Sequence, residues 1–242
     1  MQSGTRTGQP NRATDPVGGD SLDIFKAIHG RRTTRSFRPD PVPRELVEQA
    51  IDAARVAPSG NNRQPWEFVA ITDQALIHEL ALTWSGAARR FFASLTDAQI
   101  DQHFAHQPTD FKGSHWASAS LTGEAYRYAY DAPVVIVVLV SHPEIHENYP
   151  SAFLAIQNLL LAARALGLGA VITTRSVAHK EDAEAVRRLL GAPDEYLPVA
   201  VVPMGYPAKA PGPIRRRPLE DVLHWNRFGQ RSAPADGRDT TG

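Results

Sequence analysis

The spacing of apolar residues predicts helices in several parts of the chain. In these segments apolar side chains recur every three or four positions, which places them on one face of a helix. Ser21 is a plausible N-cap for the first segment, Pro43 opens the second, and Asp73 precedes the third. The helical patterns cover residues 22–29, 43–57, 73–84, 116–129 and 181–190, and residues 86–95 are a candidate continuation of the third.

Runs of β-branched and other apolar residues predict strands over residues 67–72, 133–140, 170–176 and 198–204. The run 133–140 contains no polar residue, so we expect a strand that is covered on both faces. Two helical segments precede the first strand, and strict alternation of strands and helices is absent. This order favours an α+β fold, with a mixed, mainly antiparallel central sheet flanked by helices, over a doubly wound fold.

Residues 151–169 are apolar on nearly every side. Gln157, Asn158 and Arg164 interrupt this segment and argue against a membrane span. We interpret it as the central buried helix of the domain or of a dimer interface, with Gly167 as the residue that stops it.

Both ends of the chain lack apolar periodicity and are rich in small and polar residues. We expect a disordered leader over residues 1–20, one domain over residues 21–229 and a disordered tail over residues 230–242. No signal peptide or membrane anchor is visible in the sequence, so a cytoplasmic location is the expectation.

Composition excludes several classes of function. Lys+Arg and Asp+Glu balance at 26 each, so no overall field favours nucleic acid or an acidic membrane as a partner. The sequence has no cysteine, which excludes disulfides, thiolate catalysis and cysteine metal sites.

The loop between residues 57 and 66 is the first candidate binding segment. Pro58 and Pro65 disfavour helix at the residues before them. Between them lie turn-forming residues that also carry hydroxyl, amide and exposed backbone donors: Ser59, Gly60, Asn61, Asn62 and Gln64. Most such clusters only connect elements, but loops of this kind on a rigid scaffold often hold ligands.

Two arginine-rich blocks lie far apart in the sequence, with this loop between them. One contains Arg31, Arg32, Thr33 and Arg35, and the other contains Arg215 and Arg216. Each block alone would be interpreted as a solvated loop. Together with the amide-rich loop they suit a phosphorylated ligand with a hydrogen-bonding aromatic ring, because guanidinium groups bind phosphate and amides bind a ring edge. FMN, another nucleotide and a sugar phosphate all fit this description.

Histidine pairs at metal-ligand spacing carry little weight. His103 and His106 lie near carboxylates, and His142 and His146 would face together on a helix. Such spacings are common by accident, and we predict no metal site. The polar and aromatic stretch 96–115 is instead interpreted as an exposed helical excursion or lid.

Four blocks of the sequence, in order, resemble motifs of the nitroreductase family of FMN-dependent oxidoreductases. The first is Arg31-Arg32-Thr33-Thr34-Arg35-Ser36-Phe37, and the second is Ala57-Pro58-Ser59-Gly60-x-Asn62-x-Gln64-Pro65-Trp66. The third runs from Ala155 through Gly169, and the fourth joins Gly205-Tyr206-Pro207 to Arg216-x-Pro218-Leu219 and His224-Trp225-Asn226-Arg227. The resemblance covers about residues 21–229.

The resemblance implies an α+β homodimer with FMN at the subunit interface. Arg31 and Arg216, together with Arg215, would hold the phosphate, and Thr33 would meet the phosphate or the ribityl chain. Arg35 would approach the pyrimidine edge of the flavin, where positive charge stabilises the reduced ring. Pro58, Ser59 and Asn62 would come from the other subunit, while Thr173 and Thr174 would offer backbone donors near flavin N5 and O4. The Thr173-Thr174-Arg175 stretch departs from the motifs that are common there.

The predicted activity is reduction of a small acceptor, such as a nitroaromatic or a quinone, by NAD(P)H with FMN as the carrier. The cofactor carries the chemistry, so we expect no catalytic acid–base pair in the protein. Alternatives that keep the fold are dehalogenation, enoate reduction and flavin fragmentation. A non-enzymatic flavin-binding protein is a further alternative.

Overall fold

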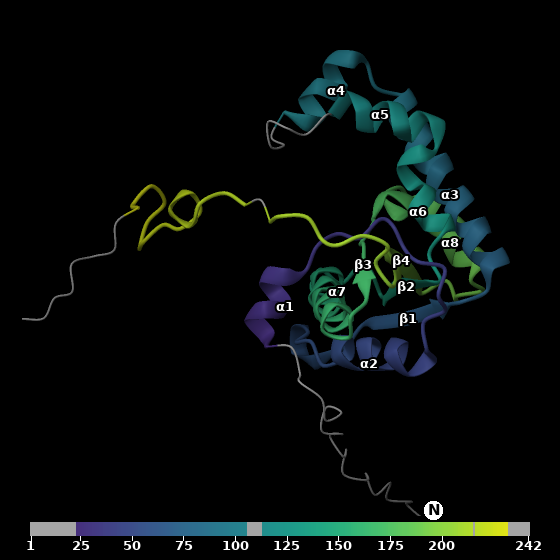
Figure 1. Ribbon diagram of the computed structural model, residues 1–242, viewed down its shortest axis with the longest axis horizontal. Coiled ribbons are helices and arrows are strands. Elements are labelled where there is room, and N and C mark those ends of the chain that lie inside the picture. Colours follow the sequence, from purple (N-terminus) through teal and green to yellow (C-terminus); the bar gives the residue numbers. More distant parts are fainter. Residues whose placement is uncertain (1–22, 106–112, 215, 232–242) are drawn as a thin grey trace, which may run out of the picture. The chain divides into compact units, whose positions relative to one another are not determined.

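The computed structural model describes residues 23–105, 113–214 and 216–231, and its internal contacts divide the chain into two units, residues 1–211 and 212–242. The first unit holds a four-stranded sheet with helices on both faces (Figure 1). Its α-helices are α1 (Ile24–Gly30), α2 (Arg44–Arg55), α3 (Gln74–Ala93), α4 (Asp97–Phe104), α5 (Gly113–Thr122), α6 (Arg127–Tyr130), α7 (Asn148–Ala165) and α8 (Lys180–Leu189).

The sheet has the strand order β1-β2-β4-β3, and each ladder is antiparallel. The strands are β1 (Trp66–Ile71), β2 (Val134–Ser141), β3 (Gly169–Ala170) and β4 (Tyr196–Gly205). In the two central ladders Val137 lies opposite Val69 on one side and Val201 on the other. A single parallel bridge joins Thr33 to Ala170 at the β3 edge. The predicted α+β class with a mixed, mainly antiparallel sheet is confirmed.

Short polar residues position the helix starts. Asp73 caps α3 by accepting a hydrogen bond from the backbone N–H of Ala75, as predicted. The first helix differs: Asp23 caps α1, accepting from Phe25 and Lys26, whereas the predicted cap, Ser21, lies outside the described residues.

Two predicted elements differ from the structure: one strand is shorter than expected, and one helix is divided. The strand expected over residues 170–176 ends at Ala170, and the short 3₁₀ helix η3 (Arg175–Val177) follows it after one bridge between Thr173 and Val201. The single helix expected over residues 116–129 is divided at Gly123, whose φ of 87° is left-handed. The 3₁₀ helix η2 (Glu124–Tyr126) and the short helix α6 follow.

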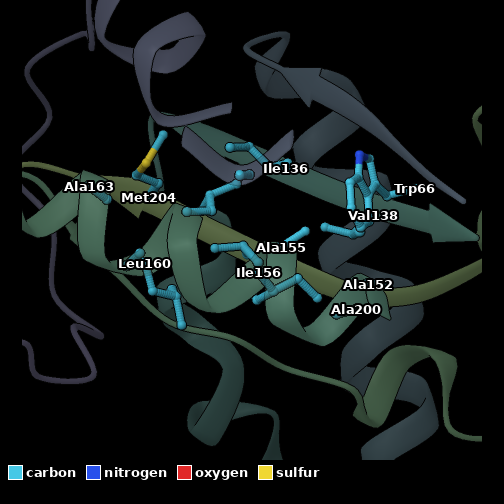
Figure 2. Close-up of a cluster of buried hydrophobic side chains, with 14 of the residues drawn as sticks. Trp66, Ile136, Val138, Ala152, Ala155, Ile156, Leu160, Ala163, Ala200 and Met204 are labelled. Carbon is cyan, nitrogen blue, oxygen red and sulfur yellow. The ribbon is translucent and has the colours of Figure 1, made fainter. Parts of the chain in front are cut away.

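The main core lies between α7 and one face of the sheet (Figure 2). Ala152, Ala155 and Ile156 of α7 pack against Ile136 and Val138 of β2, and all five side chains are buried. Full burial of such aliphatic side chains contributes about 1.5–3 kcal/mol each to stability. The prediction of a central buried helix is therefore confirmed.

A second core lies on the other face of the sheet. Ile77, Leu80 and Trp84 of α3 pack with the opposite-facing residues Val135 and Val137 of β2. Both faces of β2 are thus covered, as its unbroken apolar run predicts. At the end of α3, the helices α4 and α5 lie away from the sheet (Figure 1).

The second unit is described over residues 212–214 and 216–231. Its one helical turn in this range is the 3₁₀ helix η4 (Leu219–Asp221), and Arg217 donates to the backbone oxygen of Asp221 at 2.6 Å. Across all the described ranges no helix combines the length and the apolar character that a bilayer span requires. The predicted leader and tail lie almost wholly outside the described residues and stay predictions.

Candidate functional site

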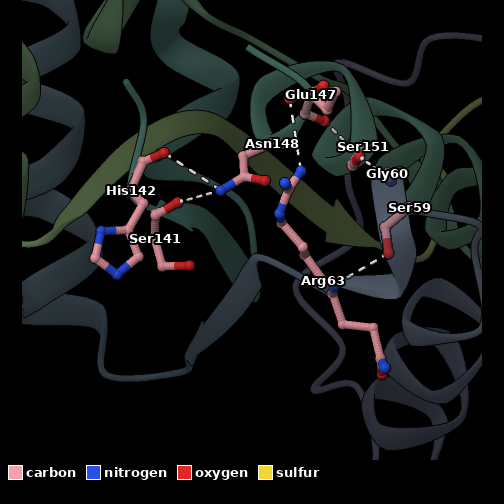
Figure 3. Close-up of polar contacts among 9 residues, drawn as sticks. Ser59, Gly60, Arg63, Ser141, His142, Glu147, Asn148 and Ser151 are labelled. Carbon is pink, nitrogen blue, oxygen red and sulfur yellow. Dashed lines mark hydrogen bonds and ion pairs between the residues drawn. The ribbon is translucent and has the colours of Figure 1, made fainter. Parts of the chain in front are cut away.

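The amide-rich loop after α2 is fastened to the first turn of α7 (Figure 3). Gly60 donates its backbone N–H to Oγ of Ser151 at 3.3 Å, and Arg63 forms an ion pair with Glu147 at 3.5 Å. Glu147 is the N-cap position of α7, and Ser151 lies one turn further on. The loop therefore sits at the N-terminal end of the central helix.

The backbone of this loop is folded into an unusual conformation. Asn61, Asn62 and Gln64 have φ values of 52°, 53° and 49°, a region that asparagine tolerates and glutamine rarely adopts. The backbone N–H of Gln64 donates to Oγ of Ser59 at 3.0 Å, which holds the turn closed. The exposed amides of Asn62 and Gln64 lie together, 3.3 Å apart. Backbone strain of this kind is concentrated at binding sites.

The first arginine block lies at the opposite end of α7. The backbone N–H of Thr34 donates to the carbonyl of Ala170 at 3.1 Å, just beyond the C-terminal end of α7. Gly30 lies against Arg164, in the last turn of α7, where a Cβ atom on Gly30 would stand 3.2 Å from Nε of the arginine. The segment that carries Arg31 to Thr34 is thus held beside the helix end and the β3 edge.

The length of α7 separates the two predicted sets within one chain. The helix has 18 residues and so spans about 27 Å at 1.5 Å per residue. An ordinary small-molecule pocket of about 300–1,000 Å³ does not reach over such a distance. The structure therefore does not bring Ser59, Asn62 and Gln64 together with Arg31 and Thr33 in a single protomer.

The structure does bring Arg35 close to Thr173, through a tyrosine. The guanidinium of Arg35 lies 6.0 Å from the ring centroid of Tyr128 and 5.3 Å from that of Trp116. Burial raises the pKa of Tyr128 to about 12, against the opposing charge of Arg35 and hydrogen bonds with Arg35 and Thr173. Arg35 and Thr173, which are far apart in the sequence, thus both influence the buried hydroxyl of Tyr128.

A second arginine reaches the same group of rings. Arg175, the first residue of η3, lies over Phe91 at 3.8 Å from the ring centroid. Burial raises the pKa of the Tyr126 hydroxyl, while the charge of Arg175, a hydrogen bond with Arg175 and the charge of Arg35 lower it. The rings of Tyr126 and Tyr128 lie 6.2 Å apart. We call Arg35, Arg175 and these aromatic rings the arginine–aromatic cluster, which comprises Phe91, Trp116, Tyr126 and Tyr128 besides the two arginines.

Sequence reasoning missed most of this cluster. Tyr126 and Tyr128 were expected to lie on a regular helix, where residues two apart point in different directions. Gly123 could have revealed the end of the helix before Tyr126, because a glycine inside a helical pattern indicates a break. Sequence reasoning also missed Glu147 and Ser151, which fasten the amide-rich loop.

The C-terminal arginines belong to the second unit. Arg216 is exposed, and Arg215 lies outside the described residues. The predicted meeting of Arg31 with Arg215 and Arg216 at a phosphate therefore stays a prediction.

An open groove of about 1130 Å³ lies elsewhere, along the β1 edge of the sheet. Its walls include Phe37, Val42, Ala70 and Tyr130, with Arg44 and Glu48 paired at its rim. None of the predicted cofactor-binding residues lines this groove. We therefore place the candidate site at the two ends of α7 and at the arginine–aromatic cluster.

Of the two histidine pairs, the structure describes His103, His142 and His146. Among the described residues, no group of three or more metal-ligating side chains gathers at one point. His142 has a φ of 49° in the turn after β2, so it does not share a helix with His146 as supposed. His106 lies outside the described residues.

Known proteins resemble this chain in sequence and in fold. The sequence model described as the Nitroreductase family matches residues 28–206. A Methanothermobacter thermautotrophicus protein, whose name pairs NADH dehydrogenase with NAD(P)H nitroreductase, is 30% identical over 79% of this chain and 81% of its own length. The NADH dehydrogenase of Thermus thermophilus is 31% identical over 88% of this chain and 98% of its own.

More distant relatives include a different activity and a solved complex. The iodotyrosine deiodinase of Nematostella vectensis is 26% identical, over 84% of this chain and 75% of its own length. A solved nitroreductase-type protein of Desulfovibrio desulfuricans, in complex with FMN, is 27% identical over 83% of this chain and 94% of its own, with a TM-score of 0.58.

Proposed function

Because this chain belongs to the nitroreductase family, we propose that it is an NAD(P)H-dependent FMN oxidoreductase that reduces a small acceptor such as a nitroaromatic or a quinone. The observation that carries the proposal is the placement of the arginine block and the amide-rich loop at opposite ends of one buried helix. In a symmetric pair of chains, each loop can complete the arginine set of the other chain.

The donors at the C-terminal end of α7 fit the phosphate of FMN. Arg31 and Arg32 are adjacent and half-buried, and the hydroxyl-bearing Thr33 follows them. Nε of Arg164 is buried beside Gly30 without a hydrogen-bond partner among the described residues. Guanidinium groups bind phosphate as charge-assisted, often bidentate donors. We assign Arg31 to the phosphate, with Arg32 as a flanking cation.

Exposed apolar surface on α1 and α7 supports a homodimer. Phe25 of α1 is 67% exposed and Leu154 of α7 is 49% exposed, with Ile24, Ile28 and Tyr149 also exposed. The two helices contact each other, so these side chains belong to neighbouring elements. Exposed apolar surface of this kind marks a protein–protein contact. The homodimer places Pro58, Ser59, Gly60, Asn62 and Gln64 of one chain in the site of the other.

FMN, when bound, supplies the hydride chemistry, and the protein supplies position and charge. Arg35 provides a fixed positive charge, which favours the negatively charged reduced form of a flavin. Burial raises the pKa of Tyr128 to about 12, so its hydroxyl stays protonated at neutral pH beside Arg35. Thr173 and Thr174 are assigned to the flavin edge beside the β3 end of the sheet.

Reductive dehalogenation is the second candidate. It is supported by the 26% identity with iodotyrosine deiodinases over most of this chain. Enoate reduction, flavin fragmentation and simple flavin storage have no specific support. An anaerobic panel with a nitroaromatic, a quinone and 3-iodotyrosine as acceptors separates the first two candidates.

The test is an anaerobic titration of the FMN-reconstituted protein with NADH and NADPH separately. The expected result is loss of the flavin absorption band with at least one nicotinamide, followed by its return when a nitroaromatic or quinone is added. A protein that stays colourless after reconstitution overturns the proposal. Bound flavin that neither nicotinamide bleaches would instead indicate a storage protein.

A further inference from the structure

Arg175 carries a positive charge but has no carboxylate partner among the described residues. It is the first residue of η3 and lies over the ring of Phe91, near the end of α3, and beside the hydroxyl of Tyr126. Over the described ranges, no carboxylate forms an ion pair with Arg175 or with Arg35. Arg175 is half-buried and Arg35 is exposed. Two guanidiniums in one cluster without a carboxylate partner in these ranges present positive charge that an anionic ligand can bind.

The geometry leaves donors of Arg175 available to such a ligand. A guanidinium has five N–H donors in its plane; the contact over Phe91 uses none of them, and the hydrogen bond with Tyr126 takes up one. The residue is half-buried and the preceding Thr174 is exposed, so the group can be reached from solvent. A carboxylate can accept two parallel hydrogen bonds from one guanidinium edge.

The rings of the cluster favour an aromatic ligand. Phe91 lies edge-on to Phe92 and to His103 of α4, with centroids 5.1 and 5.4 Å apart, and is held in place by these contacts. Trp116, which lies near Arg35, and Tyr126, which lies beside Arg175, are 6.1 Å apart. A planar ring can stack against these aromatic side chains.

We propose that Arg175 selects the electron acceptor, and that the preferred acceptors are planar aromatic molecules that carry a carboxylate. This inference rests on the proposed function, because it is Thr173 and Thr174, assigned to the flavin edge, that place the neighbouring Arg175 beside the reacting atoms. Phe91 forms the stacking surface, and Arg35 adds a second positive charge nearby. Arg175 is thus a specificity-determining residue.

The test compares two acceptors that differ only in charge, 4-nitrobenzoate and methyl 4-nitrobenzoate. Each turnover consumes one nitro group, one NAD(P)H and one proton, and yields the nitroso compound, NAD(P)⁺ and water. Specificity constants are measured with the FMN-loaded full chain, and the affinity of each compound is measured by titration calorimetry, whether or not turnover is seen. Arg175→Met removes the charge with similar bulk, and Arg175→Lys retains it.

The wild-type protein is expected to prefer the carboxylate over the ester by about tenfold or more, the factor that one charge-assisted hydrogen bond supplies. Arg175→Met should abolish this preference with little change for the ester, and Arg175→Lys should restore part of it. Arg44→Met, which removes one positive charge on α2, should leave the preference unchanged.

Equal affinity and turnover of the wild-type protein for the two compounds would overturn the inference, as would an equal loss for both compounds in Arg175→Met. Reduction of a neutral quinone distinguishes this outcome from failure of the proposed function. If the quinone is reduced and the carboxylate is not preferred, the oxidoreductase assignment stands and the role of Arg175 is wrong.

Discussion

Gly60 lies so close to Glu147 that a Cβ atom on Gly60 would stand 2.7 Å from Cβ of Glu147. This contact, together with the hydrogen bond from Gly60 to Ser151, holds the amide-rich loop against the start of α7. It explains why glycine is required at this point of the loop. A methyl group here must displace either the loop or the helix start.

Gly60→Ala is therefore expected to lower the free energy of unfolding by about 1–3 kcal/mol and to weaken FMN retention. The matched control is Gly86→Ala, within α3, where the added Cβ would meet only the flexible end of Arg90 at 3.3 Å. That change should stabilise the protein by about 0.5–1 kcal/mol, because alanine favours helix over glycine. Urea unfolding measures the change in the free energy of unfolding for each variant. Changes of the same sign in the two variants would contradict the role of the contact between Gly60 and Glu147.

The pairing of α3 with α8 depends on a buried carboxylate. The Asp182 side chain is 8% exposed and pairs with Arg90. Arg90→Met is expected to cost about 1–3 kcal/mol, because it leaves the carboxylate buried without this cation. Arg89→Met, one residue earlier on the same helix, should change stability by no more than about 0.5 kcal/mol. Equal losses in the two variants would mean that the pair does not stabilise the fold.

The raised pKa of Tyr128 makes the free energy of unfolding fall as the pH rises in the alkaline range. Its pKa is raised from 10.0 to about 12 in the folded chain. Between these values the unfolded chain loses the proton and the folded chain keeps it. The contribution of the protonated Tyr128 to the free energy of unfolding is thus fully present below pH 10. As the pH rises through about 12, this contribution of roughly 2–3 kcal/mol is lost.

Tyr128→Phe removes this ionisation, so its stability should fall less steeply than that of the wild-type protein over the same range. Tyr206→Phe, at a half-buried tyrosine after β4, provides the comparison. Denaturant unfolding at several pH values measures the difference. Parallel curves for wild type and Tyr128→Phe would show that the phenol is not held protonated by the fold.

The exposed apolar residues of α1 and α7 locate the contact of the proposed homodimer. Leu154→Glu is expected to raise the dimer dissociation constant by tenfold or more, since it buries a charge at the contact. Leu82→Glu on α3 is the matched control, because that leucine is 55% exposed and lies on a different face of the unit. Sedimentation equilibrium measures both. A larger effect at Leu82 would place the interface elsewhere.

The sequence predicted the family, the fold class and most elements, because their signals are local. The unbroken apolar run of β2 and the all-apolar character of α7 leave few other interpretations. The family prediction is confirmed by the match over residues 28–206, and with it an FMN and NAD(P)H oxidoreductase is the consistent assignment.

The shortened strand β3 shows that the local sequence pattern does not determine how far a strand pairs with its neighbour. Val171 donates to the carbonyl of Pro203, so that side of Pro203 faces β3. Proline has no N–H to return the bond, and the ladder is interrupted there. The apolar residues that follow Ala170 look like a strand in sequence, but the partner strand decides how far the pairing extends.

The candidate site was predictable in its residue types and not in its geometry. The motifs around Arg31 and Asn62 carry hydroxyl, amide and guanidinium groups that are visible in the sequence. Their placement at opposite ends of α7 depends on tertiary contacts with Ser151 and Ala170. Tyr126 meets Trp116 and Arg35 because Gly123 ends the helix that carries Trp116 and redirects the chain before Tyr126.

The central claim is that each FMN site combines the arginine block of one chain with the amide-rich loop of another. Arg31→Ala and Asn62→Ala are each expected to retain little FMN as homodimers. Co-expression of the two variants with different tags, followed by purification of the mixed dimer, gives one site with both substitutions and one intact site. FMN content of the mixed dimer is the measurement. We predict recovery to about half of the wild-type occupancy, whereas a mixed dimer that binds no more FMN than either parent would contradict a site shared between chains.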